Sequence, residues 1–397
     1  MQKSLLVLAT LGWAIAGCSD NLAPTEVESS PPAADPGFVA ADKGRRPDVT
    51  GRFIVILAER TTPAEVAREY GLQPDFVYNH ALKGFAGRIS DAARAGLLRD
   101  NRVVRVEPDG IARISAVTMT NATWGLDRVD QRSRTLSTTF TYTRTGTGIT
   151  VYVIDTGLRL GHTEFGGRAV SGFDAIDGGS ADDCNGHGTH VGGTVGGKTY
   201  GVAKKVRLVA VRVLDCTGAG TWSGVIAGID WVTANRSGPS VANLSLGGPV
   251  NSSVDYAVKR MIAAGVATAV AAGNGDAYGY AQDACKSSPA RVTAAMTISA
   301  TNKSDAKPSW SNHGSCVDWF APGVGITSAW HSGDASIATI SGTSMATPHT
   351  AGVAALYLQG SPGATPLQVR DALYAKLTKS VVTSSKSANN HLLFTNY

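Results

Sequence analysis

The sequence has little net charge, few cysteines and no long apolar segment beyond its first residues. Its 36 Lys and Arg against 31 Asp and Glu leave a formal net charge of +5, which argues against a basic stripe for nucleic acid. No later apolar run is long enough for a transmembrane helix. No Cys-x-x-Cys pair is present, which makes a zinc site a weak alternative. What remains is an ordinary globular composition, 43% hydrophobic and 17% charged, with enough apolar residues for a sizeable core.

The first residues predict export. Lys3 precedes an apolar run from Leu5 to Ala16, which at about a dozen residues fits a secretory signal peptide over 1–17 better than a stable anchor. Two endings compete. Residues 14–16 have the small-x-small form of ordinary signal cleavage, whereas 15–18 resemble the lipobox of bacterial lipoproteins. The second ending would place a lipid on Cys18 and hold the precursor at a membrane for as long as this segment stays attached.

Residues 18–50 are rich in Pro, Ala, Ser and acidic residues, a composition that predicts a flexible linker. If Cys18 is used at the end of the signal segment, an even set of cysteines remains: Cys184, Cys216, Cys285 and Cys316. An even set in an exported chain predicts disulfides, and the residues alone leave the connectivity open.

Two structural units follow the linker. Residues 51–116 predict a small α+β unit of order βαββαβ, with strands near 53–57, 76–78, 84–89 and 103–109. Residues 117–397 predict an α/β domain, because apolar strands alternate with helical segments, as at 151–155, 206–214, 222–234, 241–246, 254–264, 266–271 and 344–358. Such alternation is typical of a parallel sheet with helices on both faces.

Three motifs in the larger domain carry chemistry. Asp155 ends a strand before a Thr-Gly turn, His187 begins a glycine-flanked helix, and Ser344 lies at the start of a late helix. A serine nucleophile needs a base to take its proton and a carboxylate to hold that base in one tautomer. Strand ends and helix starts are rigid places for such groups. The three residues therefore predict a catalytic triad.

The same domain offers an oxyanion donor and edges for a peptide substrate. Asn274 follows a strand and, with the backbone N–H of Ser344, could stabilise a developing oxyanion. Small residues beside these strand ends would let a substrate pair as an added strand. The candidate substrate-binding residues are Gly218, Ala219, Gly220, Ser245, Leu246, Gly247, Ala272 and Gly273. Because glycine and alanine frame the pocket, we expect an apolar or aromatic residue before the cleaved bond.

Each motif has an ordinary structural explanation when it stands alone. Asp155 and Asn274 could be turn residues, Ser344 could be a helix cap, and His187 could bind a metal with His190. A metal site there lacks a third ligand in the local sequence. The four residues occurring together, in the order Asp, His, Asn, Ser, favour the catalytic interpretation.

These motifs resemble the subtilisin family, and most of all its proteinase K branch with the aqualysin-type bacterial proteases. The similarity rests on 124–131, 152–157, 210–216 and 341–349, and extends over nearly all of 52–397. It implies a subtilisin-like three-layer domain that works as a secreted, monomeric serine endopeptidase on protein and peptide substrates. It also implies that 51–116 is an inhibitory propeptide, removed by self-cleavage near 116–120.

The resemblance implies two disulfides, Cys184–Cys216 and Cys285–Cys316. It further implies structural Ca²⁺, held at one site by Asp318 with the carbonyls of Thr293 and Ala295, and at a second by Asp127, Asp130 and Gln131. Carboxylates and carbonyls suit a hard cation, although isolated surface acids would look the same in a sequence.

Two other functions stay open at this point. A catalytically silent binding protein on the same fold would need a broken triad or oxyanion residue, and the sequence has none. If the chain is instead a lipid-anchored surface protein, a lipid on Cys18 would hold the whole chain at a membrane. The segment 275–284 is longer than in aqualysin-like proteases, which leaves the fine specificity open.

Overall fold

The computed structural model describes residues 50–113, 117–118 and 123–397. The predicted signal peptide, nearly all of the linker, Cys18 and most of the expected cleavage region 116–120 lie outside these residues. The described residues all belong to one compact unit, Ala40–Tyr397. None of the helices in this described part of the chain is both long and apolar enough to cross a membrane.

The N-terminal unit has the predicted order βαββαβ. Its antiparallel sheet has the strand order β2-β3-β1-β4, and its elements are β1 (Arg52–Leu57), α1 (Pro63–Glu69), β2 (Phe76–Tyr78), β3 (Gly84–Arg88), α2 (Asp91–Leu97) and β4 (Val103–Pro108). Alternate residues of β1 face opposite sides of the sheet. Val55 packs against residues of the two helices, whereas Ile54 and Ile56 join a cluster that belongs to the larger domain.

The larger domain is built on a seven-stranded parallel sheet of order β16-β15-β13-β11-β7-β9-β8. The strands are β7 (Thr150–Asp155), β8 (Ala169–Asp174), β9 (Arg207–Arg212), β11 (Ser240–Leu244), β13 (Val266–Ala271), β15 (Met296–Thr301) and β16 (Trp319–Pro322). Asp155 is the last residue of β7, and Ser245 and Asn274 follow β11 and β13. The predicted polar groups therefore lie at the carboxyl ends of the strands, where parallel sheets gather functional side chains.

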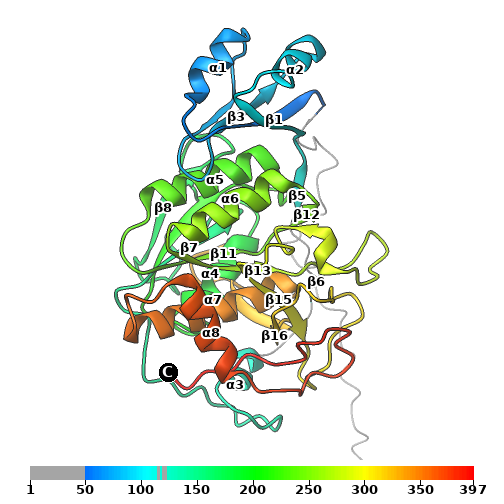
Figure 1. Ribbon diagram of the computed structural model, residues 1–397. Helices are drawn as coiled ribbons and strands as arrows, with labels where there is room; N and C mark the ends of the chain where they lie inside the picture. Colours follow the sequence, from blue (N-terminus) through cyan, green and yellow to red (C-terminus); the bar gives the residue numbers. More distant parts are fainter. Residues whose placement is uncertain (1–49, 114–116, 119–122) are drawn as a thin grey trace, which may run out of the picture. The chain divides into compact units, whose positions relative to one another are not determined.

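Helices cover both faces of this sheet (Figure 1). One face carries α5 (Trp222–Asn235) and α6 (Ser252–Ala263), and the other carries α4 (His187–Gly196), α7 (Thr343–Gly360) and α8 (Pro366–Lys376). Strand β7 is apolar almost throughout because both faces are buried: Val151 and Val153 pack in one core cluster, and Tyr152 and Ile154 in the other. The predicted three-layer architecture is confirmed.

The remaining elements are short, and the sequence patterns predicted neither these nor β8, β15, β16 and α8. The short elements are β5 (Ile111–Arg113), β6 (Val117–Thr118), α3 (Trp124–Val129), β10 (Ala219–Thr221), β12 (Gly248–Pro249), the 3-10 turn Ala284–Lys286, β14 (Ser287–Ser288), β17 (Ile326–Ala329) and β18 (Ile337–Ser341). Strand β5 pairs with β10, and β6 pairs with β18, both antiparallel. Most of these short elements are strands of two to five residues, which carry too little alternation to be recognised from sequence.

Candidate active site

Asp155 and His187 are held together at the carboxyl end of the sheet. Asp155 ends β7 and His187 begins α4, and His187 Nδ1 lies 2.7 Å from Asp155 Oδ1. Both side chains are buried, at 0% and 1% exposure, and the backbone N–H of Thr156 donates to the same carboxylate oxygen at 2.8 Å. A buried carboxylate on Nδ1 fixes the tautomer that leaves Nε2 able to accept a proton.

Ser344 is the second residue of α7, but its hydroxyl is not bonded to His187 in this structure. Ser344 Oγ donates to the carbonyl oxygen of Ser245 at 3.0 Å. His187 Nε2 is buried and has no hydrogen-bond partner among the described residues. A serine hydroxyl reaches a different acceptor by rotation about one bond, and catalytic hydrogen bonds are often unformed without substrate. The geometry therefore leaves His187 as a candidate base and Ser344 as a candidate nucleophile, provided that the Ser344 hydroxyl rotates toward His187.

Asn274 is oriented by the residue that precedes Ser344. Its side-chain oxygen accepts from both the backbone N–H and the hydroxyl of Thr343, each at 2.8 Å. The Thr343 hydroxyl in turn accepts from the Gly273 N–H at 3.1 Å. Asn312 supports the same segment, because it donates to the Ala272 carbonyl at 2.9 Å. Sequence reasoning found Asn274 but not Thr343 or Asn312, whose partners are distant along the chain.

Asp183 is a second buried acid that the sequence did not single out. Its Oδ1 accepts from the Thr156 hydroxyl at 2.9 Å, and its Oδ2 accepts from the N–H and hydroxyl of Thr189 at 2.9 and 2.6 Å. The Gly186 N–H also donates to it, at 2.9 Å. Asp183 thereby ties the end of β7 to the first turn of α4, the two elements that carry Asp155 and His187. The only local signal is an acid just before the glycine-flanked histidine.

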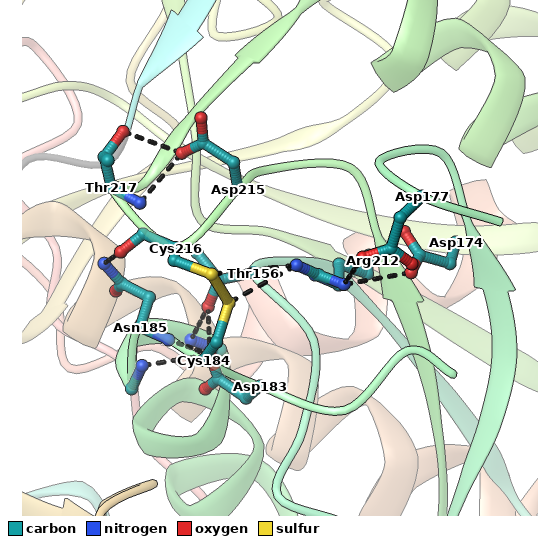
Figure 2. Close-up of a disulfide and its surroundings, with 12 residues drawn as sticks. Thr156, Asp174, Asp177, Asp183, Cys184, Asn185, Arg212, Asp215, Cys216 and Thr217 are labelled. Atoms are coloured by element: carbon teal, nitrogen blue, oxygen red, sulfur yellow. Dashed lines mark hydrogen bonds and ion pairs between the residues drawn. A yellow bond between two sulfur atoms is a disulfide. The ribbon is translucent and has the colours of Figure 1, made fainter. Parts of the chain in front are cut away.

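The pairings Cys184–Cys216 and Cys285–Cys316 are both confirmed as disulfides. Figure 2 shows the first, with Arg212 lying between its sulfur atoms and two carboxylates. Arg212 forms ion pairs with Asp174 and Asp177, and its Nη1 lies 3.0 Å from a carboxylate oxygen of each. Because Cys184 is the neighbour of Asp183, this disulfide anchors the segment that leads into α4.

One predicted substrate edge is occupied by the chain itself. In the β5–β10 pair, Ala219 is opposite Arg113 and Gly220 is opposite Ala112. Gly248 also lies close to β5. A Cβ atom added at Gly248 would be 2.9 Å from the Ile111 carbonyl oxygen, which is closer than real Cβ contacts allow. The segment after the N-terminal unit thus runs as an extended strand along 219–221 and close to Gly248.

At the second predicted metal site, one carboxylate oxygen has no hydrogen-bond donor among the described residues. Both oxygens of Asp127 accept hydrogen bonds from the loop after α3, from the N–H groups of Ser137 and Thr138 at 3.1 and 2.5 Å. Asp130 Oδ1, by contrast, is buried without a partner among the described residues, and burial raises the pKa of Asp130. The Gln131 amide nitrogen donates to backbone carbonyls of the same loop.

At the first predicted metal site, a guanidinium contacts two of the three expected ligands. Arg370 lies 2.6 Å from Asp318 Oδ1 and also donates to the Thr293 carbonyl. Burial raises the pKa of Asp318 to about 6, against the lowering effect of Arg370. Within the described part of the chain, no three His, Cys, Asp or Glu side chains converge as a metal-binding group.

Three further histidines near the site have structural partners. His190 and His349 are completely buried, and desolvation lowers their pKa values to about 3 and about 4. Each ring contacts a backbone carbonyl, His190 that of Ile326 and His349 that of Met345. His162 contacts the Ser336 carbonyl at 2.8 Å.

Comparison with known proteins fits this geometry. Residues 146–393 match the model of the subtilase family, Peptidase S8, which covers more than half of the chain, and residues 58–115 match that of peptidase inhibitor I9. The chain belongs to the subtilase family. It is a serine endopeptidase domain preceded by an I9-type propeptide, as the resemblance of the motifs implied.

The similar proteins include proteinases of two bacteria. The chain is 48% identical over 395 residues to an extracellular serine proteinase of Thermus sp., covering 92% of this chain and 95% of that protein. It is 50% identical over 331 residues to alkaline serine exoprotease A of Vibrio alginolyticus, covering 82% of this chain and 61% of that one. A crystal structure of a cold-adapted subtilisin-like serine proteinase matches with a TM-score of 0.67 and 53% identity, over 70% of this chain and all of that one.

Proposed function

We propose that this chain is a secreted, self-processing zymogen of a broad-specificity endopeptidase, with Asp155, His187 and Ser344 as its catalytic triad. The observation that carries the proposal is the buried contact between His187 Nδ1 and Asp155 Oδ1 at the carboxyl end of the parallel sheet. The Thermus relative is an extracellular serine proteinase, and this similarity supports the same destination for this chain. Processing would leave a monomeric catalytic domain over 117–397.

The proposed chemistry starts when Ser344 rotates away from the Ser245 carbonyl toward His187. His187 Nε2 takes the hydroxyl proton as Ser344 Oγ attacks the substrate carbonyl carbon, and Asp155 stabilises the imidazolium that forms. The Asn274 amide and the Ser344 N–H donate to the developing oxyanion. His187 then gives the proton to the leaving amine, and water repeats the cycle on the acyl-enzyme.

The pairing of β5 with β10 supports a position for the substrate along β10. A substrate that paired with 219–221 as Ile111–Arg113 does would run antiparallel to β10, which is recognition by strand addition. The other candidate substrate-binding residues are Gly218, Ser245, Leu246, Gly247, Ala272 and Gly273. Because β5 occupies the same backbone edge, it must leave before a substrate can enter, which supports an inhibited precursor.

Carboxylates strengthen the hold of the propeptide on the catalytic domain. Glu107 accepts from the Ser253 N–H at 2.9 Å at the start of α6, and Asp109 accepts from the Ser223 N–H at 2.9 Å at the start of α5. Helix N-termini favour negative charge. A carboxylate of the catalytic domain also contacts the propeptide, since Asp230 of α5 accepts from the His80 N–H at 2.7 Å.

The proposed enzyme has three further properties: its specificity, a calcium site and a transient lipid anchor. We expect an apolar or aromatic residue before the cleaved bond, since the segments that frame the cleft are small and uncharged. We expect Ca²⁺ at Asp127, Asp130 and Gln131, where Asp130 Oδ1 is buried without a partner among the described residues. A lipid on Cys18 would leave with the propeptide, so membrane attachment would be transient.

N-terminal sequencing of the active form tests this function most directly. We expect a new terminus within 116–120 and labelling of Ser344 by a sulfonyl fluoride. The Ser344→Ala chain should stay uncut, and the Ser180→Ala chain, which changes an exposed serine and keeps the nucleophile, serves as the processing control. Maturation of Ser344→Ala without added protease would contradict self-processing, and an unlabelled Ser344 in the processed protein would contradict the assigned nucleophile.

Intact masses of cell-associated and released protein separate the remaining alternatives. A released form lacking 1–115 supports a secreted enzyme, whether or not the precursor carries a lipid. A full-length chain that keeps a lipid on Cys18 would instead identify a surface-anchored protein. Cleavage of peptides that differ only in the residue before the scissile bond tests specificity, and we expect Phe and Leu to exceed Lys and Glu by about tenfold or more in kcat/KM.

A further inference from the structure

Arg370 lies where the family resemblance places a calcium ion. It lies in α8, directly after the core residue Val369, and its side chain is partly buried. Its Nη2 is 2.6 Å from Asp318 Oδ1, and its Nη1 donates to the Thr293 carbonyl. These are the carboxylate and one of the two carbonyls expected to hold the metal.

The other oxygen of Asp318 is also engaged. The backbone N–H of Thr297 donates to Asp318 Oδ2 at 2.8 Å, so both carboxylate oxygens have donors within the chain. The Asp318 side chain is only 12% exposed, and a buried carboxylate requires a nearby positive charge or several donors. Arg370 and Thr297 together meet that requirement.

A calcium ion and this guanidinium exclude each other. Calcium binds oxygen at about 2.3–2.6 Å, and the Arg370 nitrogen is already 2.6 Å from the same oxygen. Two cations in contact repel strongly where little water screens them. A guanidinium stays protonated at any working pH and presents a planar set of donors that matches a carboxylate and a neighbouring carbonyl.

We propose that Arg370 is a built-in counter-ion that replaces calcium at the Asp318 site. It links α8 to the segments that lead into β15 and β16, which are the elements a bound metal would otherwise connect. This part of the catalytic domain then needs no calcium for its stability. Because the Arg370–Asp318 contact involves no triad residue, a failure of this proposal would leave the proposed function unaffected.

Calcium content tests the replacement on the full chain carrying Ser344→Ala, which prevents self-digestion. Equilibrium dialysis against radioactive calcium gives the number of ions bound per chain. We expect Asp318→Asn, which keeps the shape and the Thr297 contact, to leave that number unchanged. Asp130→Asn is the matched control, since it removes the one carboxylate oxygen that lacks a partner at the second site. Loss of one bound ion in Asp318→Asn would overturn the proposal.

Removing the guanidinium gives the complementary result. We expect Arg370→Ala to bind one additional calcium ion, which the double variant with Asp318→Asn should not bind. Its melting temperature should fall in chelator and recover with calcium, whereas Asp318→Asn should not change the calcium response of the starting chain. An Arg370→Ala chain that folds and gains no calcium would also contradict the replacement. If Arg370→Ala does not fold, the calcium content of Asp318→Asn decides the question alone.

Discussion

Ser344 and Ser245 hold each other through a pair of reciprocal hydrogen bonds. Ser344 Oγ donates to the Ser245 carbonyl at 3.0 Å, and Ser245 Oγ donates to the Ser344 carbonyl at 2.8 Å. The first bond must break before Ser344 can pass its proton to His187. The second can persist, and it joins the start of α7 to the end of β11. Ser245, which we propose as a substrate-binding residue, is therefore also placed to position Ser344.

Replacing Ser245 by alanine should weaken both stability and turnover. The change leaves the Ser344 carbonyl and the Asn243 amide, which donates to Ser245 Oγ at 2.9 Å, without their buried partner. Such a loss costs about 1–3 kcal/mol. Urea unfolding and kcat measure the two effects. Ser240→Ala is the matched control, because the buried Ser240 hydroxyl has no partner among the described residues. Equal effects of the two changes would show that the Ser245 bonds contribute little.

Replacing Asn274 by alanine should lower kcat far more than it changes KM. The amide is expected to act only on the oxyanion, and loss of one such donor costs about 10²–10³ in kcat. That range is known from subtilisin, a member of the same family, and does not come from the distances here. Thr343→Val removes the hydroxyl that donates to Asn274 and should cause a smaller loss of the same kind. A purely KM effect in Asn274→Ala would refute the oxyanion role.

Removing the two disulfides should have different consequences for catalysis. Either double Cys→Ser change should lower the free energy of unfolding by about 2–4 kcal/mol. Loss of Cys184–Cys216 should also reduce kcat, because Asp183 beside it ties β7 to α4. Loss of Cys285–Cys316 is the control, since neither cysteine is adjacent to a triad residue. Denaturant unfolding and steady-state kinetics on both variants check this, and unchanged kcat in both would count against a positioning role.

His190 and His349 should make the fold acid-sensitive. Desolvation lowers their pKa values from 6.5 to about 3 and about 4, so between these values and pH 6.5 the unfolded chain binds protons that the folded chain does not. The free energy of unfolding should therefore fall as the pH drops below 6.5, by about 1.4 kcal/mol per pH unit for each histidine. Unfolding of the Ser344→Ala chain at pH 7 and pH 5 measures this slope.

A glutamine at His349 provides the corresponding comparison. His349→Gln removes one titrating group, so its slope between pH 7 and pH 5 should be shallower than that of the starting chain, whatever its stability at pH 7. The exposed His80→Gln change should leave the slope as it was. Parallel slopes for His349→Gln and the starting chain would contradict the assignment.

Local patterns predicted most of the architecture. The continuous apolar run of β7 indicated a strand buried on both faces, and the polar residue at its end marked Asp155 as a functional candidate. The short N-terminal unit was recognisable for the same reason, since its strands and helices each carry their own periodicity. The positions of His187 and Ser344 at helix starts follow from glycine and helix-forming residues nearby. These features depend on neighbours along the chain.

The sequence by itself predicted the βαββαβ order of the N-terminal unit, the alternation of strands and helices in the larger domain and the residues of the candidate triad. Only the tertiary structure decided which distant groups meet: Ser344 and Ser245, 99 residues apart, Thr156 and Asp183, and Arg370 and Asp318, 52 residues apart. Propensity and periodicity act over a few residues, whereas the partner of a buried polar group depends on how whole elements pack. For that reason the family resemblance implied a calcium ion beside Asp318, whereas the fold places the Arg370 side chain there.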